Sequence, residues 1–178
     1  NTFLRREPVW RNYFLFGLAG RSLRDTERDV FNNLFVQAES IPGAVILGKE
    51  AGPLREGGNI LWGASAVPVD DPFGKLRKSP IFLDSQRFYK PGWSTNDLVV
   101  DPKFIRLSAV HESSDLRLSP ESPAIDAGQL LPRQWPDSLR DADRGQPDVG
   151  VIPQGAEPWS VGVNGRIPLF GGAVSERD

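Results

Sequence analysis

The sequence contains no cysteine, no methionine and only one histidine. Without cysteine the chain forms no disulfide bonds and no thiolate metal site, and a single histidine excludes a zinc site built from several histidines of this chain. No stretch approaches the roughly 20 apolar residues of a membrane-spanning helix, and no Asn-x-Ser/Thr sequon is present. Because methionine is absent, we expect Asn1 to follow processing or to lie inside a longer product.

Charge and composition narrow the class of protein further. The formal net charge is −2, so bulk charge favours neither nucleic acid nor an anionic membrane as a partner. Hydrophobic residues make up 39% and charged residues 25%, as in soluble globular domains. The 18 glycines and 16 prolines indicate many turns and argue against a helix bundle.

Short strand-like segments recur along the chain, bounded by glycine, proline or charged residues. The sequence predicts strands at residues 2–4, 12–16, 30–36, 44–47, 59–62, 80–83 and 98–100. Residues 22–32 carry a serine N-cap and early acids but no apolar stripe, so we interpret them as a charged loop. By periodicity alone, the strands also fit an antiparallel sandwich.

Asparagine recurs at strand positions in a way that favours stacked repeats. Asn1, Asn33 and Asn59 are separated by 32 and 26 residues. Such steps suit coils of roughly 20–30 residues with loop insertions. In stacked coils, equivalent asparagines can hydrogen-bond from one coil to the next and satisfy buried turn groups. Asparagine is also common at strand ends, so the spacing favours a solenoid without requiring one.

Several ordered motifs extend this pattern. They are NILWG at residues 59–63, VDPKF at 100–104, DLRLSPESPAIDAG at 115–128, and DRG with PDVG at 143–150. In this order they resemble the C-terminal end of pectate-lyase-like right-handed parallel β-helix proteins. There, an NLYW-like strand precedes DPxF, DFRLxxxSPAIDAG and a closing DxxGxxR…PDIGAYE segment. Residues 30–36 resemble a vfNNif coil of that family. The usual closing AYE is replaced by Val151-Ile152-Pro153, and a tail runs on to Asp178.

The resemblance implies an all-β fold, a right-handed parallel β-helix (solenoid) fragment with an irregular C-terminal cap. Residues 1–128 would be the last coils with loop insertions, and residues 129–178 the cap and tail. It further implies an exported carbohydrate-active protein, extracellular, periplasmic or on the cell surface, with lyase- or hydrolase-like action on acidic polysaccharide. No position matches a catalytic motif, so that chemistry is expected upstream. The alternative is a non-catalytic scaffold or accessory subunit. We expect upstream sequence or another chain to cover the coil edge at Asn1.

Candidate substrate-binding residues lie in two segments. Lys75, Arg77 and Lys78 occupy a basic stretch that could hold an anionic sugar, although a solvated charged loop explains it as well. Tyr89 and Trp93 are candidate surface aromatics for stacking on sugar rings. Trp62 is instead interpreted as a core residue.

The remaining polar residues are interpreted as structural in preference to functional. His111 lies in a polar stretch and is read as an exposed loop residue rather than a catalytic base. Asp126, Asp143, Arg144 and Asp148 are expected to form an ion-paired knot, with calcium as the open alternative. No other cofactor is predicted. Gly128 is expected to adopt a backbone conformation closed to residues with a Cβ.

Overall fold

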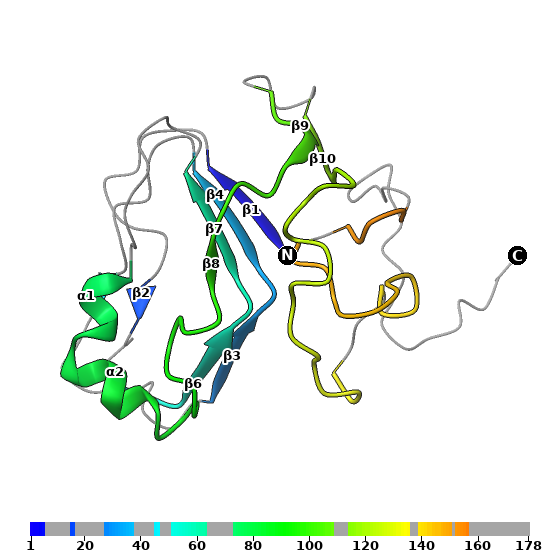
Figure 1. The fold of residues 1–178 in the computed structure, drawn as a ribbon. Coiled ribbons are helices and arrows are strands. Elements are labelled where there is room, and N and C mark those ends of the chain that lie inside the picture. Colours follow the sequence, from blue (N-terminus) through cyan, green and yellow to red (C-terminus); the bar gives the residue numbers. More distant parts are fainter. Residues whose placement is uncertain are drawn as a thin grey trace, which may run out of the picture.

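A computed structural model of the chain describes residues 1–5, 15–16, 27–37, 45–46, 51–63, 73–108, 114–135, 139–150 and 152–156. Its strands and short helices, shown in Figure 1, are β1 (Thr2–Arg5), β2 (Leu15–Phe16), β3 (Arg28–Phe31), β4 (Leu34–Gln37), β5 (Val45–Ile46), β6 (Leu54–Gly57), β7 (Ile60–Gly63), α1 (Gly74–Arg77), α2 (Pro80–Ser85), β8 (Leu98–Val99), β9 (Phe104–Arg106) and β10 (Asp115–Leu118). Within these ranges, no helix is long and apolar enough to cross a membrane.

Strands far apart in the sequence pair in parallel. The main sheet has the order β1-β4-β7-β8, and β2 pairs with β5 and β3 with β6, all in parallel. Only the β9–β10 pair of the described strands is antiparallel. Each step across the main sheet therefore follows a long excursion of the chain, and equivalent strands of successive excursions stack side by side (Figure 1). An antiparallel sandwich, which periodicity left open, does not match these pairs.

The segment at residues 30–36, predicted as one strand, is two strands joined by a sharp turn. Asn32, between β3 and β4, has a left-handed φ of 56°. Gly58 lies at the equivalent place between β6 and β7, one position after the Phe31–Gly57 pair, and has a φ of 65°. Asparagine and glycine are the residues that tolerate this conformation most readily, so both turns bend the chain in the same way.

The hydrogen bonds predicted between successive asparagines are confirmed. Asn1 Nδ2 donates to Asn33 Oδ1 at 3.2 Å, and Asn33 Nδ2 donates to Asn59 Oδ1 at 3.0 Å. The series continues to Asp97, whose Oδ1 accepts from Asn59 Nδ2 at 3.1 Å. Each rung immediately precedes a strand of the main sheet, so this asparagine ladder ties the four strands together at one end.

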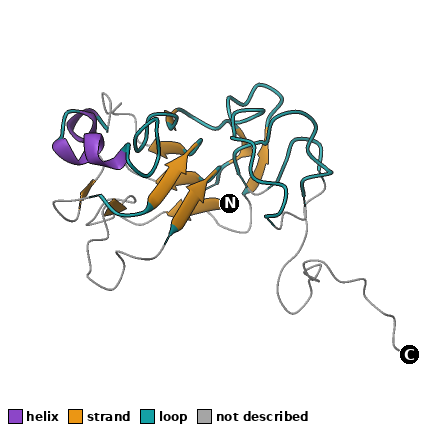
Figure 2. Cartoon of the chain, turned by 90° about the horizontal axis from the view of Figure 1, so that it is seen from below, coloured by secondary structure: helices purple, strands orange, loops and turns teal. Residues whose placement is uncertain are grey.

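The main sheet is covered on both faces. Because side chains alternate along a strand, Leu34 and Val36 of β4 point to one face and Phe35 to the other. One core comprises Leu54, Leu61, Phe73, Leu76, Ile81 and Trp93. The second comprises Leu34, Val36, Ile60, Leu118, Ala124 and Val149. Figures 1 and 2 show α1 and α2 on one side of the strands and the loop-rich C-terminal segment on the other.

Residues 80–83, predicted as a strand, form part of α2 instead. Ser79 is extended, and Pro80 starts the helix, where its fixed φ suits helical geometry and its missing N–H costs no hydrogen bond. Ile81 and Ser85 are the buried residues of α2. Their spacing of four residues is one helical turn, so a single buried stripe anchors the helix. The prediction was wrong because a short apolar run does not separate strand from helix.

Backbone amides, rather than the predicted ion pairs, hold the aspartates of the C-terminal segment. Asp148 Oδ1 accepts from Asp126 N, and Asp143 Oδ2 accepts from Asp148 N, both at 2.8 Å. Burial raises the pKa of Asp143, and the charges of Asp148 and Asp126 add to the shift. Arg144 is exposed. Within the described ranges, no group of three or more acids, histidines or cysteines is placed to hold a metal ion.

Gly128 is required by a close approach rather than by its φ. Its φ lies outside the left-handed region, so that part of the expectation was wrong. A Cβ there would lie 2.6 Å from the carbonyl oxygen of Pro147. The same oxygen accepts a hydrogen bond from Gly128 N at 2.7 Å. The left-handed residue in this turn is Asp126, with a φ of 53°.

Candidate functional site

The outward surface of β3 and β6 gathers charged and aromatic groups. Asp29 is the Cα partner of Arg55, and Phe31 is the Cα partner of Gly57. Alternation along the strands places these four residues on one face, opposite to the buried Glu56. We call this surface, together with the side chains that cover it, the β3–β6 face.

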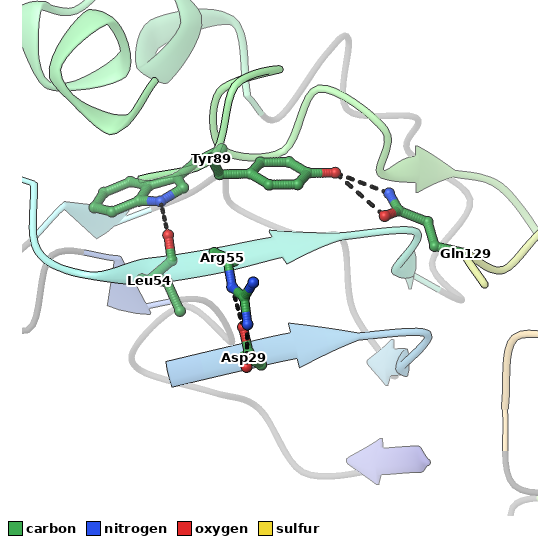
Figure 3. Close-up of polar contacts among 6 residues, drawn as sticks. Asp29, Leu54, Arg55, Tyr89 and Gln129 are labelled. Atoms are coloured by element: carbon green, nitrogen blue, oxygen red, sulfur yellow. Dashed lines mark hydrogen bonds and ion pairs between the residues drawn. The ribbon is translucent and has the colours of Figure 1, made fainter. Parts of the chain in front are cut away.

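A two-point ion pair lies on this face. Arg55 Nε donates to Asp29 Oδ1 at 2.7 Å and Arg55 Nη2 donates to Asp29 Oδ2 at 2.8 Å. The hydrogen bond to Asp29 raises the pKa of Arg55. The pair is solvent-exposed, so it contributes at most about 1 kcal/mol to stability. Its main effect is to hold one guanidinium and one carboxylate in a defined place (Figure 3).

Tyr89 reaches this face from the turn after α2. Its hydroxyl accepts hydrogen bonds from Asn96 Nδ2 at 3.1 Å and from Gln129 Nε2 at 3.0 Å. It is also 3.3 Å from Gln129 Oε1, to which it can donate. Figure 3 shows the tyrosine extended toward Gln129. The phenol is therefore fixed between two side-chain amides.

Gln129 is fixed through its backbone by the β3–β4 turn. Asn32 Oδ1 accepts from Gln129 N at 2.7 Å, and Asn32 Nδ2 donates to Gln129 O at 2.8 Å. Gly57 leaves the space that the side chains need. A Cβ at Gly57 would lie 2.6 Å from Gln129 Nε2 and 2.7 Å from the Tyr89 hydroxyl oxygen.

Three aromatic rings border the same place. The Phe31 and Tyr89 ring centroids are 6.0 Å apart at an interplanar angle of 63°. The Phe31 and Trp135 centroids are 6.3 Å apart at 42°. Rings with polar edges, next to amides and a fixed charged pair, suit ligands that present both C–H surfaces and hydroxyl groups. This combination makes the β3–β6 face the candidate binding site.

Of the two aromatics predicted for the surface, only Tyr89 is there. Trp93 is fully buried in the first core, and its Nε1 donates to the carbonyl of Leu54 at 2.9 Å. The prediction for Trp93 was wrong because Gly92, with a φ of 87°, redirects the chain just before it. The turn sends the indole inward against β6.

The basic segment lies on α1 and its C-cap. Lys75 is within α1, and Lys78 is the exposed C-cap residue. Arg77 Nη2 donates to the carbonyl of Ser94 at 2.9 Å, and its guanidinium lies 5.6 Å from the centroid of the Phe73 ring. These contacts of Arg77 secure the loop after Trp93 and belong to a different neighbourhood from those of Tyr89. His111 lies outside the described residues.

Several residues of the β3–β6 face were missed at the sequence level: Asp29, Phe31, Arg55, Asn96, Gln129 and Trp135. A signal existed for the ion pair, because Asp29 and Arg55 are 26 residues apart, as are Asn33 and Asn59. The same step of 26 residues therefore predicts that Asp29 and Arg55 lie side by side on neighbouring strands. No comparable signal connects Tyr89 with Gln129, since residue 129 lies outside the repeating strands.

Two acids lie beneath this face. Glu56 has no exposed surface, and Asp97 is 6% exposed. Burial, together with the nearby charge of Asp97, raises the pKa of Glu56 to about 10. Burial also raises the pKa of Asp97. Glycoside hydrolysis needs two carboxyl groups that flank a bound substrate, so this enclosed pair does not fit that role.

No protein-family model, curated protein or solved structure matches this chain. The family resemblance of the motifs therefore stays a prediction, and the geometry of the β3–β6 face carries the functional argument.

Proposed function

We propose that the chain forms the last coils of an exported, right-handed parallel β-helix and that its β3–β6 face binds polysaccharide. The order of the sequence motifs, the parallel pairs between successive excursions and the asparagine ladder support the β-helix. The right hand follows the strong preference of parallel crossover connections. We assign lyase- or hydrolase-like chemistry on acidic polysaccharide to a part of the polypeptide outside this face.

The observation that carries the binding proposal is the position of Tyr89. Asn96 and Gln129 hold its hydroxyl, and Phe31 lies against its ring. A side chain fixed in this way loses little conformational freedom when a ligand binds, which favours affinity. The Asp29–Arg55 pair lies on the same face and offers both a donor and an acceptor to sugar hydroxyl or carboxylate groups.

Calorimetric titration with oligogalacturonate, oligoalginate and cello-oligosaccharide tests the proposal. We expect an acidic oligosaccharide to bind, and Gly57→Ala to weaken that binding about tenfold, or about 1.4 kcal/mol. The added methyl group falls where the Tyr89 hydroxyl and Gln129 amide meet. Because those atoms belong to side chains and not to the backbone, they can shift, and the melting temperature should fall by only a few degrees.

Two further variants complete this test. Tyr89→Ala should weaken binding at least as much as Gly57→Ala. Leu83→Ala, on the exposed side of α2, is the control and should bind as the wild type does. Failure of the wild-type chain to bind any of the three oligosaccharides would reject the proposed function.

A second candidate, a scaffold in a larger assembly, is favoured by the β1 edge of the main sheet. Phe3 is 47% exposed, although its row across the sheet continues through Phe35 to Leu61, which is 1% exposed. The Phe3 ring stacks on Phe35 with centroids 4.9 Å apart, so a core-type side chain lies at the outer edge of the sheet that the described strands form. Such an edge is a template for another strand, either upstream in the same polypeptide or in another chain.

Size-exclusion chromatography with light scattering tests whether a strand from another chain covers β1. If another copy of the chain covers this edge, the wild type will associate at about 100 µM and Phe3→Asp will be monomeric. Phe3→Leu, which keeps an apolar side chain, should associate like the wild type. A monomeric wild type, or an oligomer that persists in Phe3→Asp, would reject self-association at β1.

A further inference from the structure

Glu56 and Asp97 come from different parts of the chain and meet inside the molecule around Asn59. Glu56 Oε1 accepts a hydrogen bond from the backbone N–H of Ser94, and Oε2 accepts from Asn59 Nδ2 at 3.3 Å. Asp97 Oδ1 accepts from both Asn59 N at 2.9 Å and Asn59 Nδ2 at 3.1 Å. One amide group therefore serves two carboxyl groups that are both buried.

The charged side chains on the surrounding elements bind other groups or make no hydrogen bond to Glu56 and Asp97. Arg55 of β6 points to the opposite face, and Arg77 of α1 donates to a backbone carbonyl. Asp84 of α2 is in an ion pair with Arg87. Arg28 of β3 has buried Nε and Nη1 atoms without a hydrogen bond. Among the described residues, no basic side chain donates to either carboxyl group.

Two buried oxygen atoms at this place are left without partners. They are Asp97 Oδ2 and Ser94 Oγ. Two carboxylates that share a buried site and face no cation cannot both stay ionised, because each charge disfavours the other and neither is hydrated. A proton held between them removes one of the two buried charges.

We propose that Glu56 and Asp97 share one proton and act as a pH-sensitive latch, closing the 93–97 loop onto β6 and opening it when the proton is lost. The loop is otherwise anchored by Trp93, whose indole binds the Leu54 carbonyl and whose backbone N–H binds Ser85 Oγ. The latch therefore controls how firmly the helical segment around α2 stays on the stacked strands. The latch needs no bound sugar, although opening it would also remove the Asn96 hydrogen bond to the Tyr89 hydroxyl.

The sign of the pH effect follows from the raised pKa values. The pKa of Glu56 rises from 4.5 to about 10 on folding, and that of Asp97 rises from 3.8. The folded chain therefore binds the shared proton at pH values where the unfolded chain has released it. The stabilisation is complete below about pH 4 and decreases as the pH rises toward 10.

Hydrogen exchange followed by mass spectrometry on the whole chain tests the latch. We expect amides of residues 93–97 to exchange at least tenfold faster at pH 9 than at pH 6, after correction for intrinsic exchange rates. Asp97→Asn keeps the Oδ1 acceptor and places an N–H₂ group at the unpartnered Oδ2. Because Glu56 stays buried in this variant, some pH dependence remains, but its corrected rates should differ severalfold less between the two pH values than those of the wild type. Glu56→Gln should behave in the same way and serves as the second neutral variant.

Two outcomes would overturn the proposal. One is an equal pH dependence of loop exchange in the wild type and in whichever neutral variant folds. The other is loss of the wild-type pH dependence when 1 mM Ca²⁺ is added, because a cation rather than a proton would then occupy the site.

Discussion

Replacement of Asn59 by alanine is expected to lower the free energy of unfolding by about 3–5 kcal/mol, as measured by urea denaturation. Asn59 is fully buried. Its Oδ1 accepts from the backbone and side-chain nitrogens of Asn33, both at 3.0 Å. Its Nδ2 donates to Val30 O at 3.1 Å as well as to the acid pair. Alanine leaves Asn33 N and Glu56 Oε2 without this partner in a buried place, and each such group costs about 1–3 kcal/mol before relaxation.

Asn1→Ala is the matched control for this prediction. Asn1 is the first rung of the same ladder but is exposed, so water can replace its hydrogen bond to Asn33. We expect its removal to cost less than about 1 kcal/mol. Equal costs at Asn1 and Asn59 would show that buried hydrogen bonds do not determine the stability of the ladder.

Trp93→Ala is expected to destabilise the chain by about 3–5 kcal/mol, because it removes a large, fully buried side chain from the first core. Trp93→Phe keeps most of the apolar volume but leaves the Leu54 carbonyl without its indole donor. Its cost should therefore be smaller, about 1–3 kcal/mol. Thermal and urea unfolding measure both effects.

Trp135→Ala is the comparison for the tryptophan prediction. Trp135 is only partly buried and borders the β3–β6 face. Its loss should reduce stability by less than about 1.5 kcal/mol while weakening oligosaccharide binding. Trp93→Phe should leave binding unchanged, because the indole does not reach that face. Reversed effects of the two substitutions would place the ligand at Trp93.

Features that repeat along the chain could be predicted from the sequence. The spacing of Asn1, Asn33 and Asn59 predicted hydrogen bonds that the structure contains. Asp97 was missed as the last rung because an aspartate interrupts the asparagine pattern and lies 38 residues beyond Asn59. Within this inserted stretch, the strand predicted at residues 80–83 was also wrong, because these residues form part of α2.

The sequence by itself determined the chemistry that the chain lacks and the positions of its repeated polar residues. A missing cysteine excludes disulfide bonds in any fold, and steps of one coil, 32 and then 26 residues, place equivalent asparagines next to one another. Only the tertiary structure decided that Tyr89 meets Gln129, that Trp93 points inward, and that Glu56 lies beside Asp97. These contacts join a non-repeating segment to the stacked strands. Their geometry depends on packing and on the burial of charge. The spacing of residues along the sequence predicts neither.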